Sequence, residues 1–181
     1  MIWEFQFLDW MQTLHGPLLD PVMLFLSFLG DKGVFWLLLT FLFLLRKSTR
    51  RTGIVMLAAL VIDVVLCNGI LKNLVGRPRP FSFTDTALIV SMPTDPSFPS
   101  GHTAASFAAA LALRGMHSRL AGPALLLAAL IGLSRLYLYV HFPTDVLGGI
   151  AVGIVSAWLG RRWAAFFLAE RTQLVWKDSR K

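Results

Sequence analysis

The sequence has few charged residues, few acidic residues and almost no cysteine. Charged side chains make up 15% of the 181 residues, against roughly 25% in an ordinary soluble domain. The lone Cys67 excludes an internal disulfide, and its place in an apolar run predicts a small buried side chain. Only 10 residues are Asp or Glu, which disfavours a hydrolytic metal centre with several carboxylate ligands.

The sequence also lacks the features of a signal peptide. Glu4 and Asp9 stand where such a peptide would carry lysines, and no small-residue cleavage site follows a short apolar run. We therefore expect residues 1–181 to form the mature protein as a single membrane-embedded domain.

Long apolar runs are what the sequence has instead. Hydrophobic residues make up 56% of the chain, and the mean hydropathy is +0.66. This composition predicts an all-α integral membrane protein. We expect an interfacial helix over residues 1–15, followed by a bundle of six transmembrane helices with spans near residues 20–30, 34–45, 52–71, 100–113, 120–140 and 146–160. The first two runs are shorter than a straight span requires.

The net charge of +7 reflects membrane topology rather than binding to nucleic acid. Basic residues cluster at 46–51, at 114–119 and from 161 to the end, between or after apolar runs, as in cytoplasmic loops. No basic helix or aromatic-interleaved patch is left to bind a phosphate backbone. The pattern predicts a multi-pass protein of the cell membrane with both termini in the cytoplasm. Segments 72–102 and 134–145 then face the outside, and no obligate protein partner is indicated.

Three polar motifs share that outer side: KNLVGRPRP (72–80), PSGHT (99–103) and SRLYLYVHFPTD (134–145). They combine cations, two histidines and one carboxylate, a composition that suits a phosphate group better than a metal ion. Phosphoryl transfer needs cations and N–H donors around the non-bridging oxygens. The candidates for that role are Lys72, Arg79 and Arg135, with the hydroxyl of Ser100 and the backbone N–H groups of Gly101 and His102.

The two histidines suit different roles. His141 and Asp145 are spaced i, i+4, so a helix that begins near Pro143 would let the carboxylate reach one ring nitrogen. The other nitrogen of His141 would then be free to act as a nucleophile. His102 remains to protonate the leaving oxygen and to activate water.

These motifs resemble the tripartite signature of the type-2 phosphatidic acid phosphatase family. Each signature position is present: Lys, six residues and Arg-Pro; Pro-Ser-Gly-His; and Ser-Arg, five residues, His, three residues and Asp. The resemblance implies a phosphohistidine on His141, oriented by Asp145, with His102 as acid and base. It implies that the phosphoryl group is held by Lys72, Arg79, Ser100, Gly101 and Arg135, and that no metal or organic cofactor is needed.

Several questions stay open at this point. Arg77 can be a solvated loop charge or a residue behind the phosphate ligands, and Asn68 can line the lower part of the pocket. Asp63 lies mid-span, where a carboxylate can have a functional role or form a buried structural hydrogen bond, and we favour the structural bond. The short chain resembles small bacterial undecaprenyl-pyrophosphate phosphatases. Phosphatidylglycerophosphate and phosphatidic acid phosphatases share the same motifs, and a non-catalytic lipid-phosphate binder or flippase is the alternative of another class.

Overall fold

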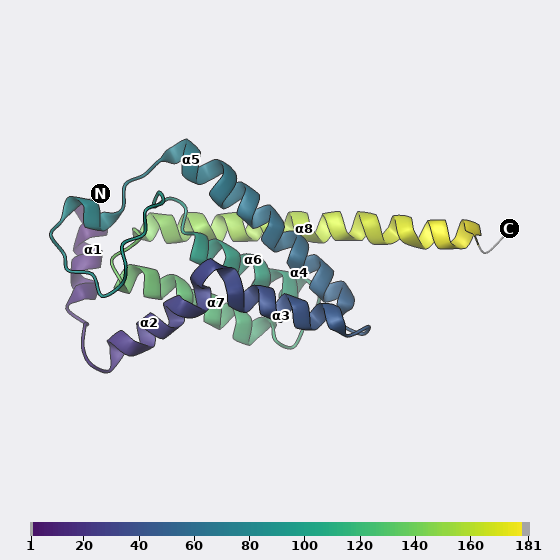
Figure 1. Ribbon diagram of the computed structural model, residues 1–181, viewed down its shortest axis with the longest axis horizontal. Helices are drawn as coiled ribbons and strands as arrows, with labels where there is room; N and C mark the ends of the chain where they lie inside the picture. Colours follow the sequence, from purple (N-terminus) through teal and green to yellow (C-terminus); the bar gives the residue numbers. More distant parts are fainter. Residues whose placement is uncertain (1, 179–181) are drawn as a thin grey trace.

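The computed structural model describes residues 2–178, and their side chains as far as residue 167. All regular structure in this part of the chain is helical. The central helix α6 (Gly101–Gly115) packs against α4 (Arg50–Asp63), α7 (Ala121–Tyr137) and α8 (Pro143–Asp178), and α8 extends beyond the bundle (Figure 1). The all-helical expectation is confirmed. Among the described residues, three helices are long and apolar enough to cross a membrane, over Leu19–Leu45, Arg50–Phe83 and Pro143–Phe167.

The segments expected to be the first two spans form one kinked passage instead. Helix α2 (Leu19–Gly30) and helix α3 (Val34–Leu45) are joined by the single 3₁₀ turn η1 (Asp31–Gly33) and continue in the same direction (Figure 1). Two runs that were expected to be separate spans are therefore joined in one candidate span. The kink comes from two successive residues with left-handed backbone, Lys32 (φ 49°) and Gly33 (φ 66°), which break the helix without reversing it.

Helix α4 continues into a π-helical segment, η2 (Val64–Leu71), and ends in α5 (Lys72–Val75). Gly76 ends this helix with a left-handed backbone (φ 58°), as is common at a helix C-terminus. The chain then passes through the 3₁₀ turn η3 (Pro80–Phe83) and a long loop to residue 100. This loop lies at the end of the bundle that α1 (Ile2–Gln12) covers (Figure 1).

Helix α1 corrects the expected position of the N-terminus. Leu8 and Met11 are buried in one apolar cluster with Leu138, Tyr139 and other residues of the segment after α7. The side chain of Gln12 donates to the carbonyl of Tyr137. The basic loop 46–49 lies at the opposite end of the bundle (Figure 1). The N-terminus therefore lies at the same end as the 134–145 motif, not opposite to it as six crossings would require.

Close helix packing joins the two helices that carry the PSGHT and HFPTD motifs. A Cβ atom on Gly149 would lie 2.7 Å from the carbonyl oxygen of Ser100, and one on Gly153 would lie 2.8 Å from that of Ala104. Both distances are shorter than a real contact allows, so only glycine lets α8 approach α6 this closely. This contact fixes Asp145, on the first turn of α8, against the start of α6.

Candidate active site

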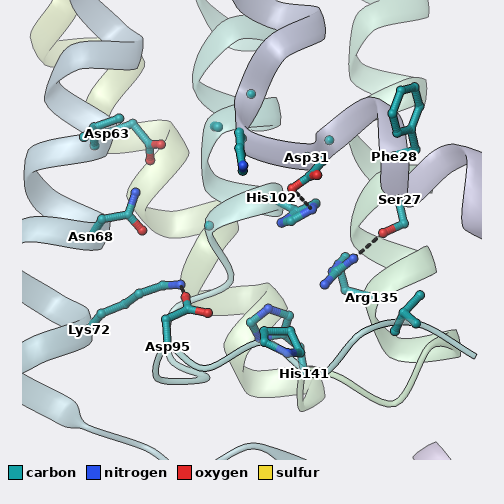
Figure 2. A pocket seen from close by; sticks show the side chains of 18 of the residues that line it. Ser27, Phe28, Asp31, Asp63, Asn68, Lys72, Asp95, His102, Arg135 and His141 are labelled. Carbon is teal, nitrogen blue, oxygen red and sulfur yellow. Dashed lines mark hydrogen bonds and ion pairs between the residues drawn. The ribbon is translucent and has the colours of Figure 1, made fainter. Parts of the chain in front are cut away.

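A cavity of about 580 Å³ brings the three motifs together. Its walls come from every helical element between α2 and α7 except η3, together with the 84–100 loop and the segments that carry Arg79 and His141. Figure 2 shows Asp31, His102 and His141 one below another, with Arg135 on one side and Lys72 on the other. Of the ten residues expected at the site, seven line the cavity: Asn68, Lys72, Arg79, Gly101, His102, Arg135 and His141. Ser100, Asp145 and Arg77 lie behind this lining.

His141 is held at the cavity wall by Asp145 and a serine that the motifs do not include. The Asp145 carboxylate lies 3.6 Å from Nδ1 of His141. Ser97 donates to the same carboxylate oxygen at 2.5 Å, and its hydroxyl is 3.4 Å from Nδ1. The backbone N–H of Phe142 also donates to this oxygen, at 2.8 Å. These bonds fix the carboxylate that faces the imidazole.

The other nitrogen of His141 faces the cavity. Nε2 lies 3.2 Å from Nη1 of Arg79, and a guanidinium N–H can only donate. Nε2 therefore accepts, and in the neutral ring the proton is on Nδ1, toward Asp145. Burial lowers the pKa of His141 to about 3, although the Asp145 carboxylate acts to raise it. The ring is thus neutral at physiological pH, with an unprotonated nitrogen available for nucleophilic attack.

Arg77 supports Asp145 and does not line the cavity. Its guanidinium donates to the second carboxylate oxygen of Asp145 at 2.6 Å and to Glu4 at 2.9 Å. It also stacks on the ring of Phe142, 4.0 Å from the centroid. Thr144 completes the cluster by donating to Glu4 at 2.6 Å. These contacts do not fit a solvated loop charge, and a place for Arg77 behind the phosphate ligands stays a prediction.

Two of the expected phosphate-binding cations share a carboxylate from the long loop. Asp95 forms an ion pair with Lys72. Arg79 donates to the Asp95 side chain and to its backbone carbonyl, both at 2.8 Å. Burial raises the pKa of Asp95, but the hydrogen bonds and charges of Lys72 and Arg79 outweigh it and lower this pKa to about 2. Asp95 is therefore ionised, and it ties the 84–100 loop to α5 and to Arg79.

The third cation comes from α7 and faces the same cavity. Arg135 is 5% exposed and donates to the hydroxyl of Ser27 on α2, while its Nε has no hydrogen-bond partner among the described residues. Gly101 lies beside Lys72, since a Cβ there would be 3.8 Å from Nζ of Lys72. Ser100 is fully buried, and its hydroxyl accepts from Thr103 at 2.9 Å. Lys72 and Arg135 thus lie on opposite sides of the cavity (Figure 2), and Arg79 contacts His141 directly.

His102 lies on the opposite side of the cavity from His141, at the first turn of α6. Gly30, the last residue of α2 before the kink η1, packs directly on its ring, because a Cβ there would lie 2.9 Å from Cδ2 of His102. Asp31 of the same kink places a carboxylate oxygen 4.0 Å from Nε2. A neutral nitrogen base, a set of cations and a second histidine across one cavity suit the transfer of a phosphoryl group to His141.

Comparison with known proteins agrees with this geometry. Residues 52–168 match the PAP2 superfamily. The chain belongs to the PAP2 superfamily. It is 35% identical over 155 residues to an undecaprenyl-diphosphatase of Sulfolobus acidocaldarius, covering 82% of this chain and 68% of that protein. It is 28% identical over 154 residues to the undecaprenyl-diphosphatase BcrC of Bacillus subtilis, covering 83% and 77%.

Solved PAP2 structures share the fold. The chain matches LpxE of Aquifex aeolicus with a TM-score of 0.75 and 30% identity, over 87% of this chain and 94% of that one. It matches a transmembrane PAP2-type phosphatidylglycerolphosphate phosphatase of Bacillus subtilis with a TM-score of 0.72 and 30% identity, over 88% and 83%. The protein is a membrane lipid phosphatase, as the signature motifs predicted.

The inner part of this PAP2 cavity contains a carboxylate without a complete set of partners. Asp63 is 1% exposed and lines the cavity above Asn68 (Figure 2). Its Oδ1 has no hydrogen-bond partner within the described part of the chain. For this oxygen, the structural hydrogen bond expected from the sequence is therefore missing.

Sequence reasoning missed five polar residues that contact the motifs of this PAP2 site: Glu4, Ser27, Asp31, Asp95 and Ser97. Each is a single polar residue in a loop or at a helix position, outside any recognisable spacing. The one available signal was the low number of acidic residues. In a chain with 10 of them, a carboxylate five residues before Ser100 could have been considered as a partner for the cations.

Proposed function

We propose that this protein removes the terminal phosphate of a polyprenyl diphosphate lipid, converting undecaprenyl pyrophosphate to undecaprenyl phosphate, through a phosphohistidine on His141. The observation that carries the proposal is the position of the neutral Nε2 of His141. It faces the cavity between Arg79 and the side occupied by His102. The substrate choice is supported by the similar chains named undecaprenyl-diphosphatase.

The first step transfers the phosphoryl group to His141. Nε2 attacks phosphorus, the N–P bond forms, and the bond from phosphorus to the leaving oxygen breaks in line with it. His102 donates its proton to that oxygen. The proton on Nδ1 of His141 remains directed at Asp145, whose negative charge balances the cationic phosphohistidine.

The second step returns the enzyme to its starting form. Neutral His102 takes a proton from a water molecule, whose oxygen attacks phosphorus as the N–P bond breaks. His102 is then protonated again, His141 is neutral, and phosphate leaves. Lys72, Arg79 and Arg135 stabilise the charge on the non-bridging oxygens in both steps. Gly101 lets the phosphoryl group approach the backbone, and Ser100 supports the start of α6.

The basic residues support an active site on the extracytoplasmic face of the cell membrane. Residues 46–51 and 114–119 lie at the end of the bundle opposite α1 and the segment between α7 and α8 (Figure 1), which is the cytoplasmic end by the positive-inside rule. The kinked α2–α3 passage, α4 with η2, α6, α7 and α8 then make five crossings. In this arrangement the N-terminus and α1 lie outside and the C-terminus lies inside.

The cavity wall also favours a lipid substrate. Phe28, Leu37 and Val64 line the cavity and are 71%, 47% and 55% exposed. Exposed apolar residues at a polar cavity allow a prenyl chain to remain in the bilayer while its phosphates reach the cations.

The deciding experiment combines a substrate comparison with trapping of the intermediate. Initial rates on undecaprenyl pyrophosphate, phosphatidylglycerophosphate and phosphatidic acid should be highest for the diphosphate. His141→Ala should abolish turnover of all three. His102→Ala should lose about 10²–10⁴-fold on lipid substrates and accumulate protein-bound phosphate that is acid-labile and alkali-stable. Labelled phosphate on a serine would refute the mechanism, and preference for phosphatidic acid would refute the substrate.

A further inference from the structure

His102 must be protonated to act as an acid, but most charges around it oppose protonation. The groups that interact with it electrostatically across the cavity are Arg135, Lys72, Arg79 and His141, and Lys32 lines the same cavity. Positive charges nearby favour the neutral form of an imidazole. An acid in this position therefore needs a negative charge of its own, as His141 has in Asp145.

The kink between α2 and α3 provides that charge. Asp31 places Oδ1 4.0 Å from Nε2 of His102, and Figure 2 shows Asp31 on the far side of the ring from His141. Among the described residues, Asp31 is the carboxylate that lies within ion-pair distance of His102. The side chain of Asp31 is 58% exposed and that of His102 is 21% exposed, so the pair is open to the cavity.

The backbone of the kink holds Asp31 in place. Gly33 has a left-handed φ of 66°, which favours glycine, and Gly30 packs against the His102 ring with no room for a side chain. Lys32, with φ 49°, is also left-handed, a conformation that costs a non-glycine residue about 1–2 kcal/mol. Backbone strain of this kind persists where the surrounding structure requires it, and it clusters at functional sites.

We infer that Asp31 is the positioning residue for His102: it orients the imidazole toward the leaving oxygen and stabilises its protonated form. The inference rests on the proposed role of His102 and extends it. In the first step the proton moves from His102 to the leaving oxygen, leaving Asp31 ionised beside a neutral ring. In the second step the proton taken from water restores the His102–Asp31 ion pair. Asp31 stays ionised and neither gains nor loses a proton in either step.

The test compares leaving groups that differ in their need for an acid. Asp31→Asn keeps the shape of the side chain and removes its charge. We expect about a 10–100-fold loss of first-step rate on a lipid phosphate, within the range of general acid catalysis. With p-nitrophenyl phosphate, whose leaving group departs as an anion, the first-turnover rate should fall less than about threefold. Asp31→Glu should recover most of the lipid activity.

The pH profile distinguishes an electrostatic role of Asp31 from a purely structural one, because a structural role would leave the profile unchanged. Removing a nearby negative charge makes protonated His102 less stable. The alkaline limb of kcat/KM for the lipid should therefore move to lower pH in Asp31→Asn, by about one pH unit because the pair is partly solvated. Asp85→Asn, the same charge change on the exposed part of the 84–100 loop, is the matched control and should leave the profile unchanged.

Two results would overturn the inference. One is an equal loss on both substrates with an unchanged pH profile. The other is a full additional loss when Asp31→Asn is combined with His102→Ala, because a residue that acts through His102 has no effect without it. Failure of the proposed function looks different. In that case His102→Ala alone would not distinguish the two leaving groups.

Discussion

Asp95 bonds the same two cations that are proposed to bind the substrate phosphate. Its carboxylate contacts Lys72 and Arg79, so the carboxylate and a phosphoryl group compete for the same donors. Asp95→Asn keeps one acceptor oxygen and removes the negative charge. We expect inorganic phosphate and vanadate to bind more tightly to this variant, because they no longer displace an anion.

The size of the effect follows from the interactions of Asp95. The two cations help to lower its pKa from 3.8 to about 2, and a tenfold change in a proton-binding constant corresponds to about 1.36 kcal/mol. The free energy equivalent to the whole pKa change is an upper limit, since the side chain is 47% exposed and solvent screens its interactions. A competing interaction of about 1 kcal/mol corresponds to a roughly fivefold lower inhibition constant for phosphate.

The assay is product inhibition with the purified protein in detergent, using a lipid phosphate as substrate. The inhibition constants of phosphate and vanadate should both fall in Asp95→Asn, KM should fall, and kcat should fall because phosphate leaves more slowly. Asp85→Asn controls for the change in net charge on the same loop. An inhibition constant that rises in Asp95→Asn would refute the reasoning. It would show that Asp95 positions Lys72 and Arg79 for phosphate rather than competing with it.

Three further predictions concern the neighbouring groups. Arg135→Lys keeps the charge but loses the planar fork, so kcat/KM on a lipid phosphate should fall about a hundredfold; near-normal activity would exclude a geometric role. Activity should survive EDTA and be inhibited by vanadate, because cationic side chains meet the phosphoryl charge, and rescue by added Mg²⁺ would contradict this. His141 has a pKa of about 3, so it loses its proton well below neutral pH. Its ionisation should therefore produce no acid limb in kcat/KM above about pH 4, and a limb near pH 6 that persists in His102→Ala would contradict this.

Much of the fold follows from the length of the apolar runs. The runs on either side of residues 31–33, expected to be separate spans, show where this reasoning stops. Glycines and charges at Gly30–Gly33 favour a turn, but a turn signal does not distinguish a reversal from a kink. Length does distinguish them. Each half, α2 or α3, has 12 residues, too few for a crossing, whereas the 27 residues of Leu19–Leu45 span about 40 Å at 1.5 Å per residue. The apolar pattern therefore locates the helices, and only the length of the joined segment shows that they form one passage.

The site was predictable where spacing carries the chemistry and not where tertiary contacts do. The i, i+4 spacing predicted that Asp145 reaches His141, and the two lie 3.6 Å apart at Nδ1. No local pattern predicted that Glu4 would contact Arg77, 73 residues later, or that Ser97 would bridge His141 and Asp145. Such partners depend on how α1 and the 84–100 loop close over the bundle, which is decided by packing of the whole chain.

In the R-P-R-P segment, local sequence sets the backbone conformation, and tertiary contacts provide the partners of the two arginines. A residue before proline is biased toward extended backbone, and Arg79, before Pro80, has φ −83° and ψ 157°. Residues two apart in an extended chain point to the same side, so Arg77 and Arg79 both face the junction of α7 and α8. There Arg79 contacts Nε2 of His141 and Arg77 contacts the outer oxygen of Asp145. The prolines therefore space two guanidinium groups to hold the His141–Asp145 pair from its two ends, one facing the cavity and the other anchored by Glu4 on α1.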